Sequence, residues 1–238
     1  MGWVRVSYYL LNPMITTLKT YVNEHFKSLL LVFLCVSLSL LLLMLRIKFS
    51  GSERYLFLVW NLFLAGIPYA ISTYIHARNF ETKWKVALLF GLWLLFLPNA
   101  PYILTDFIHL NGSRGTLQGY DFVMLSSFSL SGLLLYFISL GQMRKALTNV
   151  FKGKLVALGM PLIPFIVGFG IYLGRFLRWN SWDIIQDPMP LLIDIAQILL
   201  QPSHHITSWV ITLVFGVSLL LGNYVFSKWW KRLLNKSS

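Results

Sequence analysis

Charged residues are scarce in this sequence, and acidic residues are the scarcest of them. Of the 238 residues only 12% are Asp, Glu, Lys or Arg, whereas 57% are hydrophobic. A water-soluble domain carries about a quarter of its residues as charges, so this composition excludes an ordinary soluble protein. The mean hydropathy of +0.68 agrees with a surface that faces lipid. We therefore expect membrane lipids to be the main partners of the chain.

Cysteine is nearly absent as well. Cys35 is the single cysteine and lies inside an apolar run, which excludes an internal disulfide and any Cys–His zinc motif. No small-residue cleavage site follows that run, so we expect it to remain as a membrane anchor and not to be removed as a signal peptide. The sequence indicates no particular cofactor.

Six stretches of the chain contain no Asp, Glu, Lys, Arg or His and are 18 to 22 residues long. They cover residues 28–45, 55–75, 86–105, 122–143, 155–174 and 206–227. About 20 apolar residues at 1.5 Å rise each cross a hydrocarbon core of about 30 Å. A buried helix of a soluble protein rarely stays apolar around its whole circumference for that long. The sequence therefore predicts an all-α fold, a polytopic transmembrane helical bundle of about six spans.

Lys and Arg are divided unevenly between the two sides of such a bundle. Fourteen of the 20 lie in the N-terminal arm, the second and fourth connections and the C-terminal tail. Because basic residues accumulate on the cytoplasmic side, both termini are predicted to be cytoplasmic. Arg46, Lys48 and Arg54 in the first connection weaken this prediction. The net charge of +12 follows from this topology signal and from contact with anionic headgroups, so we do not expect nucleic acid as a partner.

The pattern divides the chain into three parts. Residues 1–27 form an arm in which apolar residues recur at helical spacing, which predicts an amphipathic helix in the membrane interface. Residues 28–227 form the six-span membrane domain, and residues 228–238 form a basic cytoplasmic tail. The apolar segment 190–200 is too short to span, so we expect a surface or re-entrant piece there.

A first group of unexplained polar residues follows the third predicted span. Two prolines interrupt the segment LPNAPY at 97–102, and each removes a backbone donor and breaks the helical ladder. Asn99 is suited to hydrogen-bond a carbonyl freed in this way. Asp106 and His109 are three residues apart and share a helix face.

A second group follows the fifth predicted span, in the segment GFGIYLGRFLRWNSWD at 168–183. Gly170 and Gly174 form a small-xxx-small pair that lets another helix approach closely. Arg175 and Arg178 follow on one face if the helix continues, and the segment ends in Asp183. This group lies on the same predicted, extracytoplasmic side as the first.

The segments LWLLFLPNAPYILTDFIHL and GFGIYLGRFLRWNSWD resemble the signatures of the bacterial domain of unknown function family 1361. The resemblance extends from about Tyr55 to the C-terminus. It implies a small multi-pass protein of the bacterial cell membrane and implies no established activity.

The polar groups allow several roles. Arg175 and Arg178 suit either an ion pair with a carboxylate or contact with an anionic group such as a lipid phosphate, and both roles stay open. Asn99 and Asn180 lie beside them as candidate headgroup ligands. The candidates for acid–base or metal-ligand chemistry are Asp106, His109 and Asp183. The weaker metal-ligand candidates are Asp106, His109, His204 and His205, which lack the spacing of a known metal motif.

Three functions remain open on the sequence alone. The first is an accessory or scaffold protein that docks an envelope protein partner. The second is an envelope-side enzyme or binder that takes an anionic lipid or lipid-linked substrate. The third is a transporter or a channel for a neutral solute. The lack of ionisable residues within the spans weakens the transporter and leaves the channel open. We expect Asp106, Arg175, Arg178 and Asp183 to converge in one polar pocket.

Overall fold

The computed structural model describes residues 2–78, 80, 82–112 and 117–235 of the chain. Within these residues every secondary-structure element is helical. The segments long and apolar enough to cross a membrane are His25–Ser50, Phe57–Arg78, Lys83–Leu110, Gln118–Val150, Gly153–Phe176 and Ile206–Arg232. This confirms the predicted all-α bundle with six spans, and the chain is a multi-pass membrane protein. The side on which each terminus lies stays a prediction.

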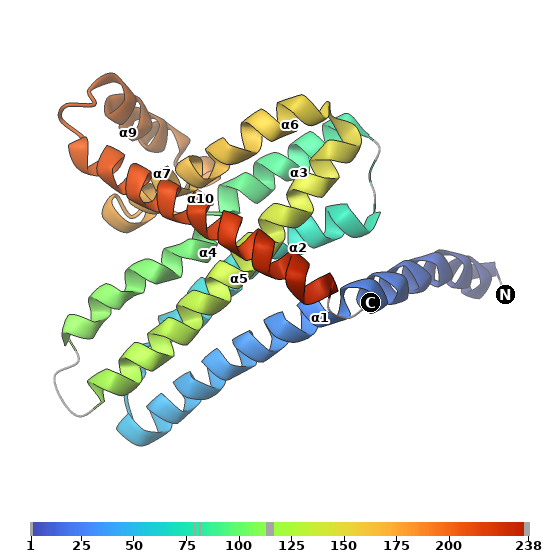
Figure 1. Cartoon of the computed structure of the whole chain (residues 1–238), viewed down its shortest axis with the longest axis horizontal. Coiled ribbons are helices and arrows are strands. Elements are labelled where there is room, and N and C mark those ends of the chain that lie inside the picture. Colours follow the sequence, from blue (N-terminus) through green and yellow to red (C-terminus); the bar gives the residue numbers. More distant parts are fainter. Residues whose placement is uncertain (1, 79, 81, 113–116, 236–238) are drawn as a thin grey trace.

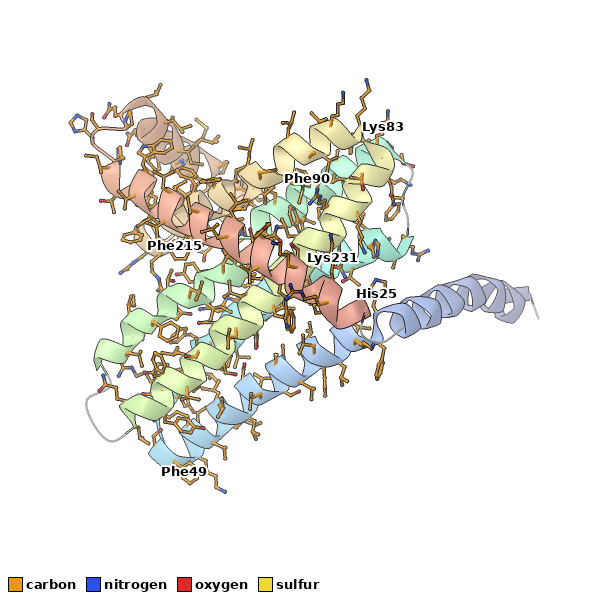
Figure 2. The ribbon with its side chains drawn as sticks, in the orientation of Figure 1. His25, Phe49, Lys83, Phe90, Phe215 and Lys231 are labelled. Atoms are coloured by element: carbon orange, nitrogen blue, oxygen red, sulfur yellow. The ribbon has the colours of Figure 1, made fainter. Side chains whose placement is uncertain are left out.

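Helix α1 (Gly2–Ser50) joins the predicted N-terminal arm and the first span without a break. Figure 1 shows its N-terminal part leading away from the other helices. The side chains of residues 2–24 lie outside the described residues, and most of the predicted amphipathic face lies there with them. At the other end of α1, Phe49 points away from the bundle (Figure 2) and is 72% exposed. The division into arm, membrane domain and tail stays a prediction.

Helix α5 (Gln118–Val150) is the centre of the bundle. In its most apolar window 61% of the residues are buried, against 17% in the first span and in the span of α10 (Ile206–Asn235). It packs against α1 and α2 (Phe57–Arg78), as Figure 1 shows. Phe128 and Tyr136 of α5 are fully buried, together with Trp93 of α3 (Lys83–Phe96). These large side chains form the middle of the core.

Polar side chains join α5 to its neighbours. Lipid tails are as apolar as the helix surfaces, so helices in a membrane associate through close packing and interhelical hydrogen bonds. The hydroxyls of Ser39 in α1 and Ser127 in α5 lie 2.8 Å apart. Ser72 of α2 donates to the side-chain carbonyl of Gln142 in α5 at 2.8 Å. The indole of Trp93 donates to a serine of α5 at 2.7 Å.

The third span breaks where the prolines predicted a break. Helix α3 ends at Phe96, a short helix α4 (Asn99–Tyr102) follows, and the span continues as the 3-10 helix η1 (Ile103–Gly112). Pro98 and Pro101 have no backbone N–H, so a regular α-helical ladder cannot run through them. The tighter turns of η1 carry three residues each, and this places Asp106 and His109 one turn apart.

The fifth span is also built from pieces. It consists of α6 (Gly153–Gly159), the 3-10 turn η2 (Met160–Leu162) and α7 (Ile163–Phe176), with Pro161 inside the turn. Helix α7 packs along α10. Between them the chain forms α8 (Asp183–Gln186) and α9 (Pro188–Leu200). Helix α9 has 13 residues, fewer than the roughly 20 that a span needs, in agreement with the predicted surface or re-entrant piece.

Candidate functional site

The centre of the polar region is an ion pair between Arg175, at the end of α7, and Asp106 of η1. The Asp106 side chain is 1% exposed and that of Arg175 is 17% exposed. Arg175 Nε also donates to the Thr105 hydroxyl at 2.7 Å, and Asn61 of α2 donates its amide N–H to Asp106 at 2.9 Å. Charge-assisted hydrogen bonds of this kind compensate the desolvation of a buried carboxylate. The group therefore ties α2, η1 and α7 together.

Close packing between α4 and α7 brings this pair together. A Cβ placed on Gly170 would lie 2.5 Å from Cγ of Pro98, and one on Gly174 would lie 3.2 Å from the ring of Tyr102. The prediction that these glycines permit a close approach is confirmed. The guanidinium of Arg175 lies over the Tyr102 ring, 4.7 Å from its centroid, in a cation–π contact.

Asn99 lies at the break between α3 and α4. Its amide nitrogen donates to the Phe96 carbonyl and to the Ser181 hydroxyl, both at 3.0 Å. Ser181 in turn donates to the Leu95 carbonyl at 3.0 Å. The expectation that Asn99 supplies a partner for a carbonyl near the prolines is confirmed. The same contacts fasten the segment after α7 onto the end of α3.

The four charged residues expected in one pocket are divided between two places. Helix α7 ends at Phe176, and Arg178 adopts a positive φ of 64°, so it leaves the helix face that Arg175 occupies. Arg178 is exposed and lines a separate cavity of about 300 Å³ together with Asp183 and Asp187. Asp183 accepts a hydrogen bond from the backbone N–H of Asn180 at 2.6 Å and one from its side chain at 3.2 Å. Arg175 and Asp106 are not part of its lining.

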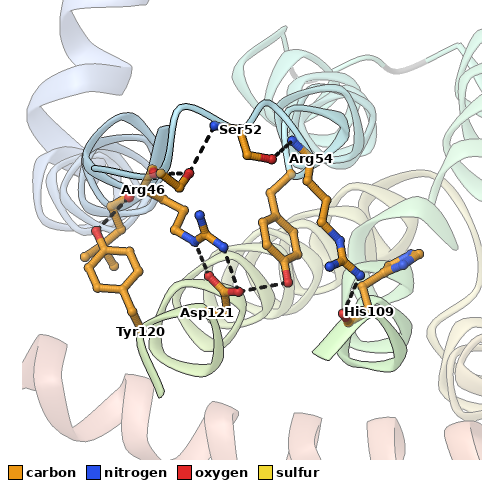
Figure 3. A network of polar contacts seen from close by, with 9 residues as sticks. Arg46, Ser52, Arg54, His109, Tyr120 and Asp121 are labelled. Atoms are coloured by element: carbon orange, nitrogen blue, oxygen red, sulfur yellow. Dashed lines mark hydrogen bonds and ion pairs between the residues drawn. The ribbon is translucent and has the colours of Figure 1, made fainter. Parts of the chain in front are cut away.

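The candidate histidines are also dispersed. His109 packs its ring 5.1 Å from that of Phe57, and its backbone carbonyl accepts a hydrogen bond from Arg54 at 3.1 Å, as Figure 3 shows. His204 is exposed and His205 is half-buried in the connection before α10. In the part of the chain that the structure describes, no three His, Cys, Asp or Glu side chains gather as a metal site would require.

A second buried ion pair was missed by the sequence reasoning. Arg46 near the end of α1 pairs with Asp121 in the first turn of α5, and the Asp121 side chain is 0% exposed. The Tyr55 hydroxyl also donates to Asp121, at 3.1 Å (Figure 3). Tyr120 donates to the Leu42 carbonyl at 2.7 Å. The sequence did contain a signal for this pair. Arg46 directly follows the first predicted span and Asp121 directly precedes the fourth, so both were predicted on the same side of the membrane.

An apolar cavity of about 770 Å³ lies beside the Arg175–Asp106 pair. Such a volume is within the range of small-molecule sites. Apolar and aromatic side chains of α2, α3, α7 and α9 form most of its wall. The polar residues that line it are Asn61, Asn99, Tyr102, Trp60, Trp179, Asn180, Ser181 and Trp182. Among the described residues that form the wall, none is Asp, Glu, Lys, Arg or His.

Helix α3 forms a large part of the cavity wall. The wall runs from Ala87 to Leu95 of that helix, which corresponds to about 12 Å of helix rise. The amides and Ser181 come from the break after α3, from α2 and from the segment after α7, so they lie toward the end at which α3 finishes. Helix α9 contributes Leu191 to the wall. Trp179 holds α9 in place by donating to Asp194 at 2.8 Å.

No curated protein and no solved structure matches the chain. One family model does match, over residues 60–221, and its description is "Protein of unknown function (DUF1361)". The matched region contains the ion pair of Arg175 and Asp106, Asn99, and the whole wall of the large cavity. It covers more than half of the chain, and the chain therefore belongs to the DUF1361 family.

Proposed function

We propose that this protein binds a lipid or a lipid-linked molecule, with the apolar chain in the large cavity and the headgroup at the end marked by Asn99 and Ser181. The observation that supports the proposal is the lining of the cavity: mostly apolar side chains along α3, with amides and Ser181 from segments that meet near the end of that helix. Such a wall matches an amphipathic ligand, whose apolar part gains contact and whose polar part needs hydrogen bonds.

Binding is favoured over chemistry by the state of the candidate acid–base groups. Asp106 receives hydrogen bonds from Arg175 and Asn61, and Asp183 receives them from Asn180. A general acid or base must reach the proton that it transfers, and neither carboxylate belongs to the cavity wall. We therefore propose an accessory role, in which the protein holds its ligand and does not transform it.

The proposed location is the bacterial cell membrane, with both termini in the cytoplasm and the headgroup end of the cavity on the extracytoplasmic side. The excess of basic residues in the arm, the tail and two connections supports this orientation. The pairing of Arg46 with Asp121 adds support, because Arg46 is one of the basic residues that had weakened it.

A scaffold role that docks an envelope protein is the second candidate. The observation in its favour is the outward face of α10, where Val210, Leu213, Val214, Val217 and Leu221 are each at least 45% exposed. The same face also suits contact with lipid tails, which every membrane-spanning helix makes. It is therefore weaker evidence for the scaffold role than the cavity is for lipid binding.

The test compares two phenylalanine substitutions at open glycines. Gly91 lines the cavity and Gly141 lies elsewhere, and a Cβ at either meets nothing within 4 Å. Each full-length variant is purified in mild detergent, and its retained lipid is measured by native mass spectrometry. Gly91→Phe is expected to lower lipid occupancy about tenfold, while Gly141→Phe keeps the original occupancy. Equal occupancy in both variants would contradict the proposal.

A further inference from the structure

We infer that the headgroup bound at this cavity is uncharged and donates hydrogen bonds through hydroxyl groups, as a glycosyl or glyceryl headgroup does. The inference rests on the proposed lipid-binding function and narrows its ligand. It departs from the anionic headgroup that the arginines had suggested. Three features of the cavity carry it: the charge of the wall, the direction of its hydrogen bonds and its aromatic faces.

The first feature is the neutral wall. Arg175 is already paired with Asp106 and lies against the ring of Tyr102, which lines the cavity while Arg175 does not. A phosphate held against this wall would find no cationic side chain in it, and a phosphate that is removed from water without such a partner is strongly disfavoured. Arg178 is exposed and lines the separate small cavity. The wall therefore selects against an anionic headgroup.

The second feature is that Asn99, at the polar end of the wall, has both of its N–H groups bonded within the protein. Asn61 donates to Asp106, Asn99 donates to Phe96 and Ser181, and Asn180 donates to Asp183. A side-chain amide has two N–H donors and one carbonyl oxygen. Asn99 is therefore left with its oxygen Oδ1 as an acceptor, while Asn61 and Asn180 each keep one N–H group besides Oδ1.

The Asn99 oxygen therefore requires a hydrogen-bond donor from the ligand. Ser181 strengthens this bias, because its hydroxyl already donates to the Leu95 carbonyl and its remaining capacity is as an acceptor. A phosphodiester oxygen only accepts hydrogen bonds, so the phosphate group itself cannot satisfy acceptors in the wall, and any donor of a phospholipid headgroup comes together with the phosphate charge. A hydroxyl group donates one hydrogen bond and satisfies them without introducing charge.

The third feature is the aromatic surface near the amides. Trp60 of α2 and Trp182 meet at a ring-centroid distance of 6.3 Å with their planes 67° apart, and both line the cavity. Tyr102 and Trp179 line it as well. A sugar ring has an apolar face of C–H groups and a rim of hydroxyls, so it packs flat on such aromatic faces while its rim reaches the amide oxygens. A glycosyl headgroup can contact both the aromatic faces and the amide oxygens of the wall. The free hydroxyl of a diacylglycerol can contact only the amide oxygens.

The experiment measures which headgroup is retained when the acyl chains are kept the same. The full-length protein in detergent is titrated with glucosyl-diacylglycerol, diacylglycerol, phosphatidylglycerol or phosphatidylethanolamine, and bound lipid is measured by native mass spectrometry. Glucosyl-diacylglycerol is expected to bind at least about tenfold more tightly than either phospholipid. Equal binding of diacylglycerol would support the hydroxyl requirement and assign it to a glyceryl group. Equal or tighter binding of either phospholipid would overturn the inference.

Two variants make the test specific to the wall. Asn180→Ala removes an exposed amide and is expected to reduce the preference for the glucosyl lipid several-fold without loss of folded protein. Leu92→Lys places a cation in the wall and is expected to shift the preference toward phosphatidylglycerol. An unchanged preference in both variants would count against the inference. If all lipids bind equally and Gly91→Phe abolishes binding, the inference alone fails; if Gly91→Phe has no effect, the proposed function fails.

Discussion

Arg175 and Asp106 form a buried ion pair across 69 positions of sequence, and the pair joins the end of the fifth span to the broken third span. The pair gives Arg175 the structural contact with a carboxylate that the sequence left open beside a ligand contact. The pair also keeps the positive charge of Arg175 beside the large cavity but outside its wall. A membrane protein can thus have two arginines in a motif and still present a neutral wall.

Removing one member of this pair should destabilise the bundle. Asp106→Asn leaves Arg175 without its counter-charge in a site where that side chain is 17% exposed, and loss of one partner of a buried pair costs about 3 kcal/mol or more. The expected result is a clearly lower midpoint of thermal unfolding in detergent. Arg178→Gln is the control, because Arg178 is exposed, and it should leave the midpoint unchanged. A stable Asp106→Asn protein would show that the pair contributes little.

The pair between Arg46 and Asp121 should matter in the same way for the contact of α1 with α5. Asp121→Asn removes the fully buried negative charge that pairs with Arg46. Tyr55→Phe removes only one hydrogen bond, worth about 1 kcal/mol. We expect the first variant to be the more destabilised in a thermal unfolding assay. Lys48→Gln, at an exposed position on the same helix, serves as the control. The reverse order of Asp121→Asn and Tyr55→Phe would argue against the pairing.

Close packing of α5 on α4 gives a third prediction. A Cβ on Gly132 would lie 2.3 Å from the backbone oxygen of Ala100, whereas one on Gly141 of the same helix meets nothing within 4 Å. Gly132→Ala should therefore lower stability and yield, because backbone cannot move aside cheaply. Gly141→Ala should be neutral or slightly stabilising, since alanine favours helix. Equal thermal midpoints for the two alanine variants would contradict the packing.

Orientation in the membrane can be tested with single cysteines. In a Cys35→Ser background, Gln186→Cys lies between α7 and α10 and Thr148→Cys lies near the end of α5, and both positions are exposed. A maleimide that does not cross membranes should label position 186 in intact cells and position 148 only after permeabilisation. The opposite labelling would invert the proposed topology.

Much of the fold could be predicted from the sequence because the signals are local. The apolar runs gave the six spans, the two prolines of LPNAPY gave the break after α3, and Gly170 and Gly174 gave the close contact with α4. Each of these features depends on neighbouring residues and on helix geometry alone.

The arrangement of the site was less predictable because it depends on which distant segments meet. Asp121 and Arg46 are 75 positions apart, and no periodic pattern links them. The positive φ of Arg178 ends the helical register after α7. The prediction that Arg178 lies on the same helix face as Arg175 was therefore wrong. The cavity is lined by several helices and a connection, and its shape follows from packing that no single motif encodes.

An experimental structure of the full-length protein in a lipid nanodisc tests the proposed binding most directly. The nanodisc should contain glucosyl-diacylglycerol mixed with phosphatidylglycerol. We predict an elongated ligand density along α3, with its headgroup within hydrogen-bond distance of the Asn99 Oδ1 atom and no phosphate beside it. A cavity closed by side chains, or one that holds a phospholipid headgroup against Asn99, would contradict this prediction.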